Sequence, residues 1–247
     1  DRLWITSISS VPDGFVGRSS TISAICVEKL PVCANAFKDH IITSRFESDA
    51  RKRGYSRIAG ADEVGRGCLF GSVFAAAVIL DPARPIRGLN DSKVLSPQKR
   101  AVLAERIQDR AVSWAIGAVD AFWIDRINIY QASRVAMKQA VEKLNIPPDF
   151  LFVDALTLDV NIPQKALIKG DLRCASIAAA SILAKVARDQ SMARWHEIYP
   201  EYNLASNKGY CAPDHYSGLD AVGPVAQHRY SFEPVRAAAQ LGQGRLF

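Results

Sequence analysis

One segment constrains the fold of this chain more than any other. Residues 174–198 begin with CASIAAASILAKVARD, in which alanine and serine are mixed with isoleucine and leucine. A helix of this composition has small or apolar side chains on almost every side, so it must be buried on most sides. We therefore predict that residues 174–198 form the central helix of the domain.

The rest of the organised chain alternates strands and helices. The glycine-rich turn Gly65-Arg66-Gly67 joins two apolar runs and predicts a hairpin. A helix is expected from Ser96-Pro97, a capping serine before a permitted proline, to about Arg110, and another from Ile127 to Leu144. The runs typical of β-strands are residues 57–64, 72–80, 113–119, 150–153 and 166–168. This order, without a long internal repeat, predicts an α/β domain with a central mixed β-sheet flanked by α-helices.

The two ends of the chain differ in organisation. Residues 1–45 show no sustained period of a helix or a strand, and we expect a poorly ordered N-terminal leader. Residues 46–57 are polar and basic and form a short helical or linking entry. They open the main domain, residues 46–247, which ends in a helical C-terminal part. A chain of 247 residues fits one domain with an appendage.

Composition limits the classes of protein to which this chain can belong. The formal charge of +6 favours a polyanionic partner. The five cysteines lie far apart without a C-x-x-C motif, which argues against a disulfide framework or a zinc site and favours a reducing cytosol. The longest apolar run, residues 73–80, is far shorter than the roughly 20 residues of a membrane helix. We expect a cytoplasmic monomer with no membrane segment.

Four carboxylates follow predicted strands. Asp62 and Glu63 end the first strand, Asp154 follows residues 150–153, and Asp171 follows the last strand. Neighbouring residues of a regular strand point to opposite faces, so Asp62 and Glu63 serve one site only if the strand ends or bends there. The glycines that follow favour such a bend. Ligand sites gather at strand ends in α/β sheets, so these acids are candidates for one site.

Such a cluster would repel itself unless it is protonated or holds a hard divalent metal. Oxygen ligands without clustered His or Cys favour Mg²⁺ or Mn²⁺ in a two-metal site, where one ion activates water and the other stabilises the leaving oxygen of a phosphodiester. The acids therefore indicate phosphodiester hydrolysis. Taken singly, each acid is better explained as a cap, a turn residue or a surface charge, because apolar runs often end in acids.

An ordered series of motifs decides between these explanations. It consists of residues 60–67 (GADEVGRG), Asp91-Ser92-Lys93, Val153-Asp154-Ala155, Lys169-Gly170-Asp171, residues 176–189 (SIAAASILAKVARD) and Gly209-Tyr210. This series closely resembles ribonuclease HII, over about residues 57–235. Several motifs in the same order are far more specific than any one of them.

The resemblance implies a ribonuclease H-like fold and an endonuclease that binds RNA–DNA hybrids and DNA containing ribonucleotides. Such an enzyme hydrolyses the RNA strand of a hybrid and cuts 5′ to ribonucleotides embedded in duplex DNA, leaving 5′-phosphate and 3′-hydroxyl ends. By position, the four metal-site acids of the family match Asp62, Glu63, Asp154 and Asp171, here called the acidic cluster.

The resemblance also implies substrate contacts. Residues Gly65-Arg66-Gly67 match the loop that senses the ribose 2′-hydroxyl, here called the sensing loop, and Tyr210 matches the tyrosine that stacks on the neighbouring deoxyribose. Glycines let a backbone approach a sugar closely and offer N–H and C=O groups to it. The basic residues expected to contact phosphates, which position a duplex without reading its sequence, are Arg66, Lys93, Lys169 and Lys185. Each of these residues, taken alone, is also explained as a solvated charge, a turn or a core aromatic.

The chain departs from the family pattern beside the sensing loop. The family commonly has alanine at the position of Val64, proline at Cys68, a small residue at Phe70 and proline at Ser72. None of these positions is a metal ligand, so the departures bear on how strictly a ribonucleotide is selected rather than on catalysis.

Three alternatives remain. A ribonuclease HIII-like nuclease shares the acids but carries a larger N-terminal domain, for which residues 1–45 are too short and irregular. Another ribonuclease H-like nuclease, such as a Holliday-junction resolvase or a transposase, would lack the sensing loop and Tyr210. A non-cleaving hybrid-binding module would be favoured by the loss of an acid, and all four are present.

Overall fold

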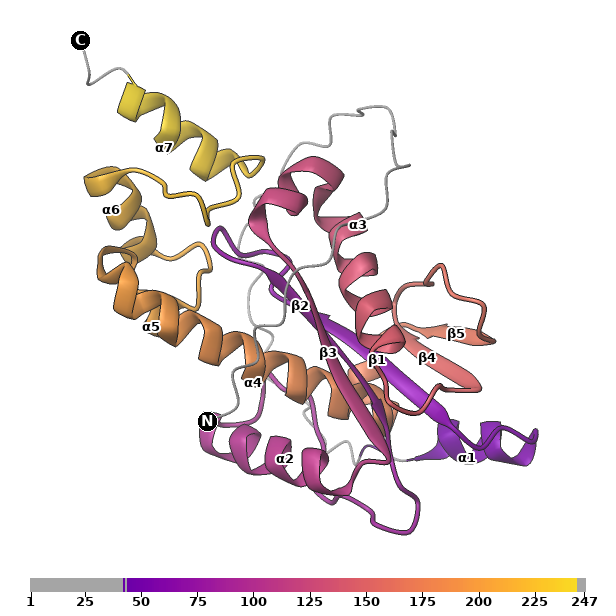
Figure 1. The fold of residues 1–247 in the computed structure, drawn as a ribbon. Coiled ribbons are helices and arrows are strands. Elements are labelled where there is room, and N and C mark those ends of the chain that lie inside the picture. Colours follow the sequence, from indigo (N-terminus) through magenta and orange to yellow (C-terminus); the bar gives the residue numbers. More distant parts are fainter. Residues whose placement is uncertain (1–41, 43, 244–247) are drawn as a thin grey trace. The chain divides into compact units, whose positions relative to one another are not determined.

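The computed structural model describes residue 42 and residues 44–243, which belong to one compact unit (Figure 1). The predicted leader, residues 1–45, lies outside the described residues except for residues 42, 44 and 45. No helix in the described part of the chain has both the length and the apolar character of a membrane span.

A five-stranded mixed sheet forms the centre of this unit. β1 pairs antiparallel with β2 and parallel with β4; β2 pairs antiparallel with β3, and β4 pairs parallel with β5. The predicted hairpin and the mixed α/β sheet are therefore confirmed. In the spatial order β3-β2-β1-β4-β5, the strands are β3 (Ser113–Val119), β2 (Val73–Ile79), β1 (Ile58–Val64), β4 (Phe150–Asp154) and β5 (Gln164–Leu167).

Helices surround the sheet and form the C-terminal part (Figure 1). Short 3₁₀ turns, η1 (Gly170–Leu172) and η2 (Pro200–Tyr202), flank α4. The α-helices of the described residues are α1 (Arg45–Lys52), α2 (Pro97–Arg110), α3 (Ala121–Glu142), α4 (Ala175–Ile198), α5 (Leu204–Asn207), α6 (Pro213–Val222) and α7 (Glu233–Gln243).

The two faces of the sheet are covered by different helices. Alternate strand residues such as Ala75 and Ala77 pack with α3 in one buried cluster, whereas Ala76 and Val78 pack with α2 and α4 in another. This alternation is the period of a strand that is buried on both faces. The predicted central helix is confirmed, because α4 packs on β1 and β2 and about half of its residues are buried.

Glycine allows each covering helix to approach the sheet closely. A Cβ atom at Gly60 in β1 would lie 2.3 Å from the backbone N of Ile177 in α4. A Cβ atom at Gly117 in β3 would lie 2.1 Å from the backbone O of Ala136 in α3. Contacts this short do not occur between real Cβ atoms and backbone, so a larger residue at either position would push the helix away from the sheet.

The start of α4 is held by a side chain from α1. Glu47 is buried, and its Oε1 accepts hydrogen bonds from the backbone N and the Oγ of Ser176 at 2.7 and 2.8 Å. The preceding N-cap residue, Cys174, provides no side-chain cap. Glu47 therefore satisfies a free N–H at the beginning of α4 from a distant part of the sequence.

Two predicted boundaries were wrong. α3 begins at Ala121, six residues before the predicted start, because the side chain of Asp120 caps it by accepting from the N–H of Trp123. The helix is kinked at Asn128, where φ is 65°, so the predicted period from Ile127 describes only its second part. β5 covers residues 164–167 rather than 166–168, since its pairing with β4 begins at Gln164.

Candidate active site

The sheet brings the acidic cluster to one edge. β1 and β4 are parallel neighbours with Ala61 opposite Val153, so Asp62 and Asp154 follow at the same level of the sheet. Asp171 lies in η1, between β5 and α4. The backbone N–H of Gly170 donates to Oδ1 of Asp154 at 2.7 Å, which ties η1 to the end of β4. Parallel strand ends therefore position the acids as the sequence predicts.

The carboxylates of the cluster act on one another electrostatically. Burial raises the pKa of Asp62 well above its usual value, and Glu63, Asp154 and Asp171 raise it further, while a hydrogen bond with Ser181 lowers it. Burial also raises the pKa of Glu63, against the influence of Arg66. The pKa of Asp171 is raised by burial and by Asp154. Asp62, Glu63 and Asp171 thus lie in one environment that disfavours their charged forms, and Asp154 contributes its negative charge to it.

The sequence requires the first strand to end or bend at Asp62 and Glu63; β1 stays in register with β2 as far as Val64 and ends there, directly before Gly65, where φ is 93°. Asp62 forms a hydrogen bond with Ser181 of α4, and Glu63 forms a 3.2 Å ion pair with Arg66. Within the described residues no three His, Cys, Asp or Glu side chains are already arranged to hold a metal ion.

The donor set nevertheless fits a hard divalent cation. Every candidate ligand is a carboxylate, the type that Mg²⁺ and Mn²⁺ prefer. Oε2 of Glu63 is buried without a hydrogen-bond partner, and Asp62 is only 5% exposed. A buried carboxylate oxygen without a donor is costly, and a cation beside it would remove that cost together with the mutual repulsion.

The sensing loop and Tyr210 lie side by side. Cys68, just after the loop, forms a backbone bridge with Tyr210, and the N–H of Leu69 donates to Gly209 O at 2.8 Å. Gly67 and the Tyr210 side chain are exposed, so both are accessible to a ligand. The departures at Cys68 and Phe70 are both fully buried, and a proline at residue 68 would lack the backbone N–H of the cysteine.

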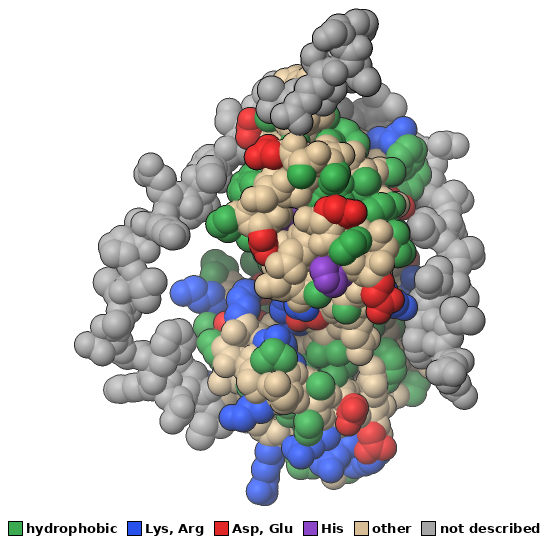
Figure 2. All heavy atoms as spheres, turned by 90° about the vertical axis from the view of Figure 1, so that its left-hand side faces the viewer, with side chains coloured by type: hydrophobic (Ala, Val, Ile, Leu, Met, Phe, Trp, Pro, Cys, Tyr) green, Lys and Arg blue, Asp and Glu red, His purple; other side chains and the backbone are tan. Residues whose placement is uncertain are grey.

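The basic residues predicted to bind phosphate lie beside the acids or beside Tyr210. Lys93 lowers the pKa of Asp171, and the exposed Lys169 is two residues before it. Lys185 donates to Asp189 at 2.7 Å and lies 6.0 Å from the centroid of the Tyr210 ring. Figure 2 shows Lys and Arg side chains concentrated in the lower half of the face that it displays. The described residues therefore combine a carboxylate site with nearby cations.

Sequence reasoning missed four buried residues that support this region: Arg188, His215, His228 and Arg229. Arg188 stands within the motif at residues 176–189, but no role followed from the motif. The signal that could have identified Arg188 is its charge inside the most apolar helix of the chain, because charged residues are seldom fully buried without a specific partner.

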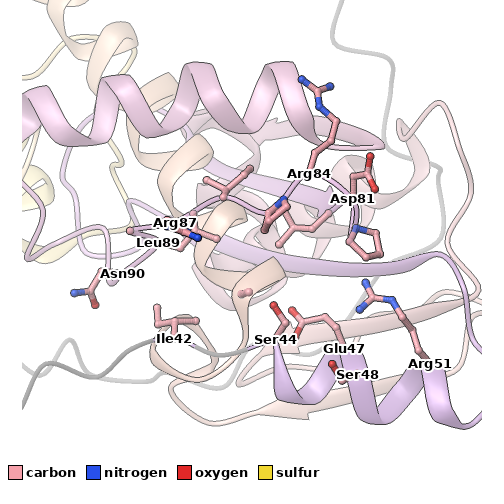
Figure 3. Close-up of a pocket in the computed structure, with 16 residues that line it drawn as sticks. Ile42, Ser44, Glu47, Ser48, Arg51, Asp81, Arg84, Arg87, Leu89 and Asn90 are labelled. Atoms are coloured by element: carbon pink, nitrogen blue, oxygen red, sulfur yellow. The ribbon is translucent and has the colours of Figure 1, made fainter.

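A separate pocket of about 690 Å³ lies between α1 and residues 80–90 and contains none of the predicted site residues. Figure 3 shows Ser44 and Glu47 on one side of it and Asp81 and Arg84 on the other. Its buried carboxylate, Glu47, already binds Ser176, and Arg84 pairs with Asp109 at 2.8 Å. Glu47 and Arg84 thus have structural partners, although Oε2 of Glu47 and Nε of Arg51 are buried without a hydrogen-bond partner. Because none of the predicted site residues lines the pocket, we assign it no function.

Comparison with known proteins agrees with this arrangement. The family model described as Ribonuclease HII matches residues 59–235. A curated ribonuclease HII from Solibacter usitatus is 63% identical over 191 residues, which cover 77% of this chain and 84% of that protein.

Two solved structures share the fold. The ribonuclease H2 from Pyrococcus horikoshii superposes with a TM-score of 0.66 at 23% identity, covering 76% of this chain and 99% of that one. The ribonuclease HIII called Bst-RNase HIII, solved in complex with Mn²⁺, gives a TM-score of 0.56 at 18% identity, covering 79% of this chain and 73% of that one. The expected ribonuclease H-like fold is confirmed.

Proposed function

Because this chain belongs to the ribonuclease HII family, and is therefore a ribonuclease H type 2 endonuclease, we propose that it cuts 5′ to ribonucleotides embedded in duplex DNA and hydrolyses the RNA strand of RNA–DNA hybrids. The products are 5′-phosphate and 3′-hydroxyl ends. The observation that carries the proposal is the electrostatically coupled acidic cluster next to an exposed sensing loop and Tyr210.

The acidic cluster is assigned to Mg²⁺ or Mn²⁺. Asp62, Glu63, Asp154 and Asp171 would hold these ions, with Asp62 as the central ligand, and Asp171 would also help to orient the attacking water. The central role of Asp62 is supported by its position, since all three other acids act on its pKa. When bound, such ions activate water and stabilise the charge on the leaving oxygen of a phosphodiester.

The other site residues bind and orient the substrate. Backbone groups of the sensing loop contact the ribose 2′-hydroxyl, the atom that distinguishes RNA from DNA, and the Tyr210 ring packs against the neighbouring sugar. Lys93 and Lys169 bind phosphates. Arg66 and Lys185 also bind phosphates. In the free protein Arg66 contacts the carboxylate of Glu63 and Lys185 contacts that of Asp189, so a phosphate must compete with these carboxylates.

A reducing, cytoplasmic location and a monomeric state complete the proposal. The cysteines of the described residues, Cys68, Cys174 and Cys211, are free thiols, as a reducing compartment requires.

Cleavage of three labelled duplexes tests the proposed activity: DNA with one ribonucleotide, a continuous RNA–DNA hybrid, and plain DNA, each with Mg²⁺, Mn²⁺ or EDTA. We expect metal-dependent cutting 5′ to the single ribonucleotide, cutting of the hybrid, and no cutting of plain DNA. Cutting of the continuous hybrid alone would move the specificity towards ribonuclease HIII. Binding of the hybrid without cleavage under any condition would leave a binding module and contradict the proposal.

A further inference from the structure

Two fully buried arginines lie beneath the sensing loop and the Tyr210 segment. Arg188 in α4 and Arg229 after α6 are both 0% exposed. In the part of the chain that the structure describes, neither guanidinium lies within ion-pair distance of a carboxylate. Burying a cation without a counter-charge is costly, and burial lowers the pKa of Arg229 to about 10. The hydrogen bonds of the two arginines show which part of the structure their burial stabilises.

Arg229 binds both ends of residues 66–71, a segment that begins within the sensing loop. Its Nη1 donates to Arg66 O at 2.8 Å and its Nε donates to Gly71 O at 2.9 Å. The C=O and N–H of a trans peptide point in opposite directions. Because the Arg66 carbonyl points inward to a buried guanidinium, the N–H of Gly67 points outward, and this N–H has no hydrogen-bond partner among the described residues. Arg229 thus sets which face of the loop the ligand meets.

Arg188 joins the same segment to Tyr210. Its Nη1 donates to Lys208 O at 2.7 Å and its Nη2 to Phe70 O at 3.4 Å, while its guanidinium carbon lies 5.5 Å from the centroid of the Tyr210 ring. It also packs directly on Gly65, where φ is +93° and an added Cβ would lie 2.3 Å from Nε of Arg188. One side chain therefore contacts both substrate-sensing elements.

A pair of buried histidines also holds Tyr210, through its backbone carbonyl. Nδ1 of His228 accepts from the N–H of Val225 at 3.0 Å, so its proton is on Nε2, which donates to Nε2 of His215 at 3.2 Å. Nδ1 of His215 then carries a proton and donates to Tyr210 O at 3.0 Å. Burial lowers the pKa of both rings, which keeps this hydrogen-bonded chain neutral.

We propose that Arg188 and Arg229 are positioning residues that fix the sensing loop and Tyr210 in one rigid unit and thereby determine selection of a single ribonucleotide. The inference rests on the proposed function. Neither arginine touches the substrate; each acts through the carbonyl groups that it binds. A planar guanidinium is required because it donates to two carbonyls in fixed directions, which an ammonium group does not.

The substrate itself provides a discriminating readout. A duplex with one ribonucleotide presents a single 2′-hydroxyl, so a displaced sensing loop has no second target. A continuous hybrid presents a 2′-hydroxyl at every position of one strand, so a displaced loop still finds one. Loss of positioning must therefore reduce cleavage of the single-ribonucleotide duplex more than cleavage of the hybrid.

The test compares wild type with Arg188→Lys and Arg229→Lys, and with Arg106→Lys, an exposed arginine of α2, as the matched control. We expect kcat/KM on the single-ribonucleotide duplex to fall at least ten-fold in both buried variants. The ratio of kcat/KM between that duplex and the hybrid should fall at least five-fold, while Mn²⁺ affinity measured by calorimetry stays within two-fold of wild type. Arg106→Lys should match wild type in every respect.

An unchanged ratio in folded variants, or an equal loss on both substrates, would overturn the positioning role. If wild type cuts neither substrate, the proposed function fails instead. If the lysine variants do not fold, hydrogen exchange of the wild-type protein decides. The hydrogen-bonded amides of the two segments, residues 65–71 and 208–210, must open together with α4 as denaturant is added; these are the amides of Leu69, Gly71, Lys208, Gly209 and Tyr210. Independent opening of either segment would overturn the proposal.

Discussion

Alanine in place of Gly60 tests whether the contact between β1 and α4 positions the active site. The added Cβ would lie 2.3 Å from backbone atoms of Ser176 and Ile177, whereas ordinary contacts begin at 3.4 Å. A helix backbone cannot rotate out of the way, so the start of α4 must withdraw from the sheet by roughly 1 Å. Overpacking of this kind costs about 3 kcal/mol. That cost corresponds to a decrease in Tm of about 6–12 °C for a domain of this size.

The same displacement should reduce activity, because α4 carries Ser181, which bonds to Asp62. Misplacement by about 1 Å can lower turnover roughly a hundred-fold. Gly117→Ala is the matched control: its Cβ would overlap Ala136 O of α3, on the opposite face from α4. Calorimetry and cleavage per folded molecule should show that both variants lose stability and only Gly60→Ala loses activity. A wild-type Tm in Gly60→Ala, or equal loss of activity in both, would refute this reasoning.

Two further outcomes follow from buried polar groups. Burial and His215 lower the pKa of His228 from 6.5 to about 3, so below pH 6.5 the unfolded chain binds a proton that the native chain does not. The free energy of unfolding should fall by about 2 kcal/mol from pH 6.5 to 5, as urea titration would show, and His228→Gln should remove this part of the pH dependence; an unaltered slope would contradict it. Glu47→Ala removes the acceptor for Ser176 at the start of α4 and should cost about 2–4 kcal/mol in thermal unfolding, whereas the exposed Ser48→Ala should cost under about 0.5 kcal/mol. Equal effects of the two substitutions would argue against the cap.

Much of the fold could be predicted because the local sequence signals for strands and helices agree with the pattern of buried residues. The strand at residues 113–119 and the helix from Pro97 to Arg110 were predicted with their observed bounds, and Ser96 caps α2 by accepting from the N–H of Lys99. The early start of α3 was missed because its first turns do not share the hydrophobic period that follows the kink at Asn128.

For the site, the positions of the acids could be predicted from the sequence, but the contacts that support them could not. The acids could be placed at strand ends, since parallel neighbours such as β1 and β4 end at the same edge of a sheet. Contacts between segments that lie far apart along the chain leave no comparable pattern in the sequence. Arg229 binds Arg66 O from 163 residues away, and Glu47 binds Ser176 from 129 residues away. Such pairs depend on the completed fold, so they could be identified only from the structure.

The central claim is that the acidic cluster holds divalent metal, and titration of the folded protein with Mn²⁺ in a calorimeter tests it most directly. Burial and neighbouring carboxylates disfavour the charge of Asp62, so Asp62→Asn should fold at least as stably as wild type. We expect its Mn²⁺ affinity to fall at least ten-fold, whereas Asp159→Asn, whose side chain is 89% exposed, should bind as wild type does. Unchanged Mn²⁺ affinity in folded Asp62→Asn would contradict the account.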